Sequence, residues 1–130
     1  MNFYQPAMKY FEQVQKVGQV TGSTHAMLAF TPEGKFLGGT EDVGRHVALD
    51  KLIGMRAMKK WGPVVVFLSS RASYEMVQKA AVTGIEILFA ISAPTNRALR
   101  LAKECDLTLS AFCRDNRANI YNAPERLLNL

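Results

Sequence analysis

Near the start of the chain the spacing of the apolar residues changes from helical to strand-like. Residues 3–18 place apolar side chains at helical intervals and Gly18 ends the run, which predicts an amphipathic helix. Residues 24–30 (THAMLAF) and 35–40 are typical of strands, and the turn residues TPEG separate them, so a β-hairpin is expected next. The apolar positions of the helix are Phe3, Met8, Phe11, Val14 and Val17.

Further along, short continuous apolar runs alternate with amphipathic segments. Three runs are typical of strands buried on both faces: VVVFL at 64–68, ILFAI at 87–91 and LTLSAF at 107–112. Two helices are predicted between them, at 73–84 (ending at Gly84) and 95–105. This alternation predicts parallel strands joined by right-handed crossovers. Together with the antiparallel hairpin, it indicates an α/β fold, a three-layer α/β/α sandwich with a mixed sheet.

The stretch EDVGRHVALDK (41–51) stands directly before another helical apolar pattern. Asp42 is expected to cap a helix that runs to about Lys60. The apolar residues expected to face the core are Leu49, Leu52, Ile53 and Met58. Two interpretations stay open. The segment is an ordinary helix start, in which His46 and Asp50 hydrogen-bond along one face, or its first turn forms part of an anion site.

Composition narrows the class of protein. The 130 residues form one domain of common size, and 48% hydrophobic with 21% charged residues is typical of a soluble globular fold. No apolar run approaches the roughly 18 residues of a membrane-spanning helix, and the start lacks a secretory signal pattern. Cys105 and Cys113 form no zinc spacing or disulfide framework, so a reduced cytoplasmic protein is expected. The net charge of +5 indicates an anionic partner without choosing among nucleotide, nucleic acid and acidic protein.

Polar and cationic residues follow each of the three buried strands. The carboxyl ends of parallel strands meet at one edge of a sheet, so these residues are expected to lie together. Arg45 and His46, at a further helix start, are expected to join them. Guanidinium groups, hydroxyls and helix N-termini bind phosphate, and the edge is therefore predicted to form an anion site. The residues that follow the strands are Ser69, Arg71, Ser92, Thr95, Asn96, Arg97, Arg114 and Arg117.

Each of these residues also has a plain structural explanation. A single arginine is most often solvated at the surface, and a histidine at a strand start, such as His25, is more often structural than a ligand. Arg114 could activate the thiol of Cys113, although an inert buried cysteine is the commoner case. The recurrence of cations after every buried strand nevertheless favours a site. Core packing is the usual role of the three aromatic residues that could instead stack on a base, Tyr74, Phe112 and Tyr121.

Five motifs follow one another along the chain: TGSTH (21–25), EDVGRHVALDK (41–51), SSRASYEMVQKAAVTGI (69–85), ISAPTNRALRLA (91–102) and FCRDNRANIY (112–121). In this order and spacing they resemble the FdhD/NarQ family of formate dehydrogenase accessory sulfurtransferases, and the likeness runs from about Gln13 to the C-terminus. The resemblance implies a cytidine deaminase-like fold, which agrees with the sandwich. It also implies a protein that carries sulfur from a cysteine desulfurase to molybdenum cofactor during maturation of formate dehydrogenase.

The resemblance further implies a ligand, the bis-molybdopterin guanine dinucleotide form of the cofactor, of which GDP is a fragment analogue. Asp42 would then order the turn, Arg45 would pair with phosphate, and His46 would donate a hydrogen bond or shuttle a proton. The segment that matches the family's cofactor contact is Phe112, Cys113, Arg114, Asp115, Asn116 and Arg117. The other candidate cofactor-binding residues are His25, Arg45, His46, Ser69, Arg71, Ser92 and Thr95.

The chain departs from the family pattern in two ways. The family's persulfide cysteine lies in a CxxC loop upstream of the TG-x-x-H motif, and this chain, residues 1–130, has no cysteine there; a single FdhD-like domain with no catalytic residue is expected. Ser70 stands where the family usually has glycine, which is expected to narrow the backbone's approach to phosphate, and Val47 where it usually has asparagine.

Several functions stay open at this point. The chain takes part in sulfur transfer, or it is a non-catalytic module that binds guanine nucleotide or cofactor. A homodimer that buries the first helix is also open. Zinc-dependent base deamination is excluded, because it requires H-x-E and P-C-x-x-C, whereas Ala26 and Met27 follow His25 and no P-C-x-x-C occurs. No metal or membrane partner is expected. A nucleic-acid partner is not expected either, because the sequence has no basic stripe interleaved with exposed aromatics.

Overall fold

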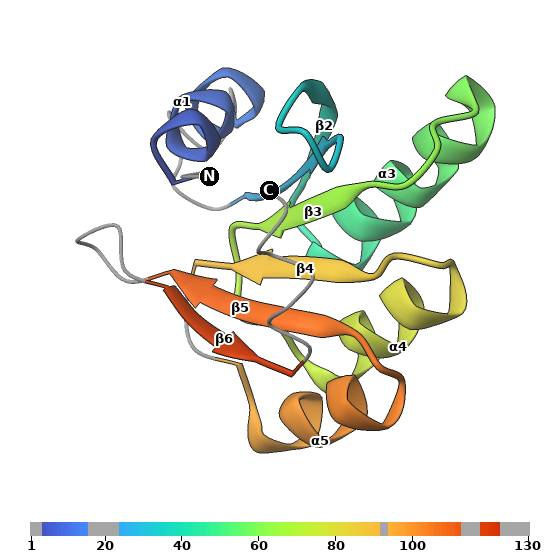
Figure 1. Cartoon of the computed structure of the whole chain (residues 1–130). Helices are drawn as coiled ribbons and strands as arrows, with labels where there is room; N and C mark the ends of the chain where they lie inside the picture. The colour runs from blue at the N-terminus through green and yellow to red at the C-terminus, as the bar shows by residue number, and fades with distance from the viewer. Residues whose placement is uncertain (1–3, 16–23, 92–93, 113–117, 123–130) are drawn as a thin grey trace.

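A computed structural model describes residues 4–15, 24–91, 94–112 and 118–122 of the chain (Figure 1). These residues form one six-stranded sheet with strand order β2-β1-β3-β4-β5-β6. In chain order the elements are α1 (Tyr4–Val14), β1 (His25–Phe30), β2 (Phe36–Asp42), α3 (Arg45–Lys59), β3 (Val65–Leu68), α4 (Tyr74–Val82), β4 (Ile87–Ala90), α5 (Asn96–Glu104), β5 (Thr108–Phe112) and β6 (Ala118–Tyr121).

The sheet is mixed, as the sequence predicts. Strands β3, β4 and β5 are parallel, and the hairpin β1–β2 adds two antiparallel strands, with Met27 of β1 opposite Leu68 of β3. Strand β6 pairs antiparallel with β5 at the far edge and was not predicted. Its short sequence ANIY ends the motif FCRDNRANIY, directly after the segment 112–117 that is expected to contact the cofactor. No alternating pattern marks ANIY as a strand.

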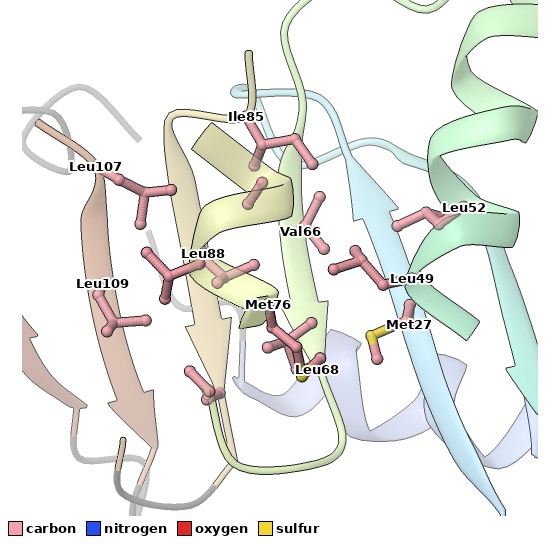
Figure 2. Packing of buried hydrophobic residues seen from close by; sticks show 14 of the residues in the cluster. Met27, Leu49, Leu52, Val66, Leu68, Met76, Ile85, Leu88, Leu107 and Leu109 are labelled. Carbon is pink, nitrogen blue, oxygen red and sulfur yellow. The ribbon is translucent and has the colours of Figure 1, made fainter. Parts of the chain in front are cut away.

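Helices cover both faces of the sheet, so the predicted three-layer sandwich is confirmed. Helices α3, α4 and α5 pack on one face around a core of aliphatic side chains, where Figure 2 shows Leu49 beside Met27 and Met76 against Leu68. On the other face α1 contributes Phe11 to a second, aromatic cluster. Rings stack there at short distance, such as Phe67 on Phe89 with centroids 4.6 Å apart. The two clusters place β1, β3 and β4 between apolar layers.

Helices α3, α4 and α5 end in the same way. In α3 the Trp61 N–H donates to the carbonyl of Arg56 at 3.1 Å and the Lys60 N–H to that of Ala57 at 3.4 Å, which is a Schellman motif. The equivalent bonds close α4 and α5. An apolar residue then turns back toward the sheet: Trp61, Ile85 and Leu107. The residue with positive φ is Lys60 (54°) in α3, Gly84 (82°) in α4 and Asp106 (55°) after α5.

The start of α3 differs from the sequence prediction. Asp42 does not cap the helix, because β2 continues through Asp42, which lies opposite His25 in the register, and the helix begins at Arg45. Gly44 is the N-cap and offers no side-chain bond. Asp42 instead orders the turn, as predicted, since its Oδ1 accepts a hydrogen bond from the Gly44 N–H at 3.0 Å.

The inward face of α3 is only partly as predicted. Leu49 and Leu52 are buried and Ile53 packs against the core from a half-buried position, but Met58 is 85% exposed. Met58 lies nine residues, or about 2.5 helical turns, after Leu49, so its side chain is on the opposite side of α3 from the buried face. The first helix ends at Val14, and residues 16–18 of the predicted helix lie outside the described residues.

Candidate functional site

The turns that follow the parallel strands lie at one edge of the sheet, as the sequence predicts. The arrowheads of β3, β4 and β5 point to the same side in Figure 1. The first residue of β1 and the last of β2 lie at this edge too, because β1 runs antiparallel to both β2 and β3. Helices α3, α4 and α5 therefore all begin here. We call the residues that these segments present at this edge the rim: His25, Arg45, His46, Ser69, Arg71, Tyr74, Glu75, Thr95 and Arg97.

The three helix starts place charged side chains in equivalent positions. The second residue of each helix is His46 in α3, Glu75 in α4 and Arg97 in α5. Helices α3 and α5 have no acidic residue in the first turn. Because the N-terminal end of a helix carries a partial positive charge, cations there are unfavourable by electrostatics alone. Thus α3 and α5 begin with cations where acidic residues are usual. An anion bound at the rim would offset the repulsion between these cations and the positive helix ends.

Arg45 and His46 are available to such an anion. Arg45 is exposed and His46 is half-buried, and neither forms a hydrogen bond or salt bridge with the described part of the chain. The other charged residues of the same motif have structural partners. Lys51 pairs with Asp42 at 2.6 Å, which holds the pKa of the Asp42 carboxyl below its ordinary value.

Asp50 of the same motif ties two helices together. The Lys79 ammonium of α4 donates to both Asp50 carboxylate oxygens, at 2.9 and 3.0 Å. The hydrogen bond between His46 and Asp50 that the sequence left open is not present, because Asp50 faces α4. The motif therefore divides its roles. Asp42 and Lys51 order the turn before α3, Asp50 joins α3 to α4, and Arg45 and His46 lie at the rim.

Glu75 is an acidic residue of the rim, in addition to Asp42 at the end of β2, and the sequence did not single it out. Its own backbone N–H lowers the pKa of the Glu75 carboxyl most, and the Ser73 side chain and the charges of His46 and Arg97 lower it further. Arg97 also lies over the ring of Tyr74, with its guanidinium carbon 4.6 Å from the ring centroid. Ser73 followed by an acid is an ordinary helix start in sequence, so only the neighbouring helices reveal this cluster.

Several predicted site residues have structural roles. The Ser69 hydroxyl accepts a hydrogen bond from the Ala26 N–H at 2.8 Å, and the Ser69 N–H donates to the Ala26 carbonyl, so Ser69 fastens β3 to β1. Thr95 is the N-cap of α5 and accepts from the Ala98 N–H at 3.1 Å. Ser70 is buried and its hydroxyl contacts the Met76 sulfur at 4.0 Å, so this side chain turns into the core and not into the rim.

The remaining candidates fall in two groups. His25 begins β1 and lies opposite Asp42, and Arg71 is exposed directly after β3, so both are at the rim. Phe112 is the last residue of β5, and only its backbone is described. Six candidates lie outside the described residues: Ser92, Cys113, Arg114, Asp115, Asn116 and Arg117. That the residues after β5 contribute to the rim is therefore a prediction from the sequence alone.

Two further observations limit the chemistry of the described residues. In the ranges that the structure describes, no group of three or more His, Cys, Asp or Glu side chains could hold a metal ion. None of the described helices is long and apolar enough to cross a membrane. A rim with three arginines, two histidines and helix N-termini can bind and orient an anion.

An α/β sandwich that gathers cations and helix N-termini at one carboxyl edge has the features of a ligand-binding domain, and the comparisons narrow this class to a family. The model of the FdhD/NarQ family matches residues 4–128, and the chain belongs to this family. The fold is similar to the crystal structure of a protein from Desulfotalea psychrophila that is described as a formate dehydrogenase accessory protein, with a TM-score of 0.79 and 35% sequence identity. The match covers 85% of this chain and 48% of that one, so the chain spans about half the length of its structural neighbour.

Proposed function

We propose that the chain is the cofactor-binding part of a protein that acts in the maturation of formate dehydrogenase. Its substrate in this role is molybdenum cofactor in the bis-molybdopterin guanine dinucleotide form, held at the rim by its phosphates. Family membership and the name of the structural neighbour support the biological setting. The observation that carries the ligand class is the pair of helices that begin with cations and no acid, α3 and α5.

The rim residues divide the work of binding. Arg45 and Arg97 supply guanidinium forks that suit phosphate oxygens, and the N–H groups of the first turns of α3 and α5 point to the same side. The charges of His46 and Arg97 act on Glu75, whose negative charge partly offsets theirs when no ligand is bound. The Tyr74–Arg97 stack offers a flat surface that a purine base can extend.

In this proposal Cys105 does not carry sulfur from a cysteine desulfurase. Cys105 is a free, exposed cysteine at the C-terminal end of α5. That end lies at the opposite edge of the sheet from the rim. A persulfide there could not reach a ligand held at the helix N-termini, about nine residues or 13 Å away along the α5 axis. The described chain therefore fits a binding role better than a sulfur-carrying one.

Calorimetric titration with GDP tests the ligand class, with ADP as the control for the base. Arg45→Ala and Arg97→Ala are each expected to weaken GDP binding by about 1.5–3 kcal/mol, the range of charge-assisted hydrogen bonds. Arg100→Ala removes the same charge from the middle of α5 and is expected to leave GDP affinity unchanged. A folded chain that shows no heat and no thermal stabilisation with millimolar GDP would overturn the proposal.

Intact-mass spectrometry tests the sulfur-carrying role separately. After incubation with a cysteine desulfurase and cysteine, we expect no added sulfur on Cys105 that a reductant removes. A reducible sulfur adduct that is lost in the Cys105→Ser variant would show that the described chain carries sulfur itself.

A further inference from the structure

The edge of the sheet opposite the rim carries a second set of features that nucleotide binding does not use. The last turns of α3 lie here next to the turn that follows α4, because the Arg56 guanidinium donates to the Thr83 carbonyl at 2.9 Å. Residues of the two helix ends line an open groove of about 460 Å³. We call it the Trp61 groove, and the residues that line it are Ile53, Arg56, Ala57, Lys60, Trp61 and Thr83.

The groove has an aromatic wall. Trp61 is half-buried, and its ring lies so close to β2 that a Cβ on Gly38 would be 2.9 Å from Trp61 Cη2. Tryptophan and arginine, which both line the groove, are enriched at the centres of protein interfaces.

The charge in the groove has one sign. Arg56 and Lys60 line it, Lys59 lies 5.9 Å from the Trp61 ring centroid, and none of the six lining residues is acidic. Two adjoining hollows at the same edge each contain an acid, Glu33 in one and Glu86 in the other. The Trp61 groove is thus the hollow of these three that would attract an anionic group.

Helix stability explains only part of this arrangement. Cations near a helix C-terminus are favourable, and Arg56 donates to the Thr83 carbonyl at 2.9 Å. Lys60 adopts a left-handed φ of 54° at the position where α4 has Gly84 and α5 has Asp106. Glycine and asparagine adopt this conformation at much lower cost than lysine. A strained lysine whose charge faces a groove indicates that the charge has a function there.

We propose that the Trp61 groove docks an acidic segment of a partner protein, with one apolar side chain of that segment against Trp61. A second copy of this chain is a poor occupant, since it carries a net charge of +5. A flat anionic membrane is also disfavoured, because Trp61 forms the wall of a concave site and is held against β2. Docking at this edge leaves the rim open, so a partner can be bound while the ligand is exchanged.

The experiment uses Trp61 as its reporter, since the chain has one tryptophan. An array holds twelve-residue peptides that together cover the cysteine desulfurase and the formate dehydrogenase of the same organism. The peptides that bind best are then titrated into the chain while the fluorescence of Trp61 is followed. Only the choice of these two proteins rests on the proposed function. The binders are expected to be acidic with an apolar residue, and to change the emission of Trp61.

Charge variants identify the surface that binds. Lys60→Glu and Ala57→Glu change two residues that line the groove, and each is expected to weaken the binding of the best peptide by about tenfold or more. Both sites are exposed, so folding should persist. Lys103→Glu makes the same charge change in the last turn of α5 and should have no effect. Arg45→Ala should lose GDP but keep the peptide, which separates this inference from the proposed function.

Three outcomes would overturn the inference. Peptides that bind no better than scrambled sequences would do so, as would equal binding by Lys60→Glu and the parent chain. The third is binding to phosphatidylserine vesicles that exceeds binding to every peptide and is lost in Lys60→Glu, since that would make the groove a membrane contact.

Discussion

Removal of a cation from the start of α3 is expected to stabilise the fold while it weakens ligand binding. Arg45 is the first residue of α3, it is exposed, and the first turn holds no acid. A cation at a helix N-terminus costs about 0.3–1 kcal/mol at an exposed position. Arg45→Ala removes this repulsion and breaks no hydrogen bond or salt bridge of the described chain. We therefore expect the free energy of unfolding to rise by about 0.3–1 kcal/mol.

Urea unfolding with and without salt measures this gain. Because the interaction is electrostatic and exposed, the gain of Arg45→Ala should shrink in 0.5 M NaCl, where the Debye length is roughly 4 Å. Glu75→Gln, at the start of α4, is expected to change stability in the opposite direction, since it removes an acid that suits its helix end. Arg100→Ala, in the middle of α5, serves as the neutral control.

The same variant must lose ligand affinity for the reasoning to hold. Arg45→Ala should bind GDP about ten- to a hundredfold more weakly than the parent chain, the range that one charge-assisted contact supports. A variant that unfolds more easily and binds GDP unchanged would make Arg45 a structural residue. That result would refute the explanation of why α3 begins with cations.

Three further predictions follow from packing and charge. Gly39→Ala should lower the free energy of unfolding by about 1–3 kcal/mol, because the new Cβ would lie 2.8 Å from Val14 Cγ2 and 3.0 Å from the Met27 carbonyl oxygen. Gly54→Ala should raise it by about 1 kcal/mol, because a Cβ there has nothing within 4 Å and alanine favours a helix. Thermal unfolding of both variants checks the two signs. Lys60→Gly should stabilise the chain by about 1 kcal/mol through relief of its φ of 54°, and should weaken peptide binding at the Trp61 groove; unchanged or lower stability in urea would count against strain at this position. The lowered pKa values of Asp42 and Glu75 mean that their stabilising contribution is present above the ordinary carboxyl range and is lost as the pH falls from about 6 to 3; Asp42→Asn and Glu75→Gln should each reduce the steepness of that loss in pH-dependent unfolding.

Features with a local physical cause could be predicted from the sequence. The start of α4 at Ser73, its end at Gly84 and the start of α5 at Thr95 each depend on hydrogen bonds between residues a few positions apart. The buried strands are continuous apolar runs, and their alternation with helices determines the parallel centre of the sheet. Because parallel strands share one carboxyl edge, the position of the rim could be inferred as well.

Features that join distant segments needed the tertiary structure. The cluster of His46, Glu75 and Arg97 exists because three helices lie side by side, and no spacing along the chain relates these residues. Asp42 fits the capping pattern, but pairing with β1 keeps it in a strand, so α3 starts three residues later. Met58, by contrast, lies about 2.5 turns after Leu49 and so on the outer side of α3, which the helical period alone already shows. The period of a helix tells which residues share a face, and only the surrounding elements decide whether that face is covered.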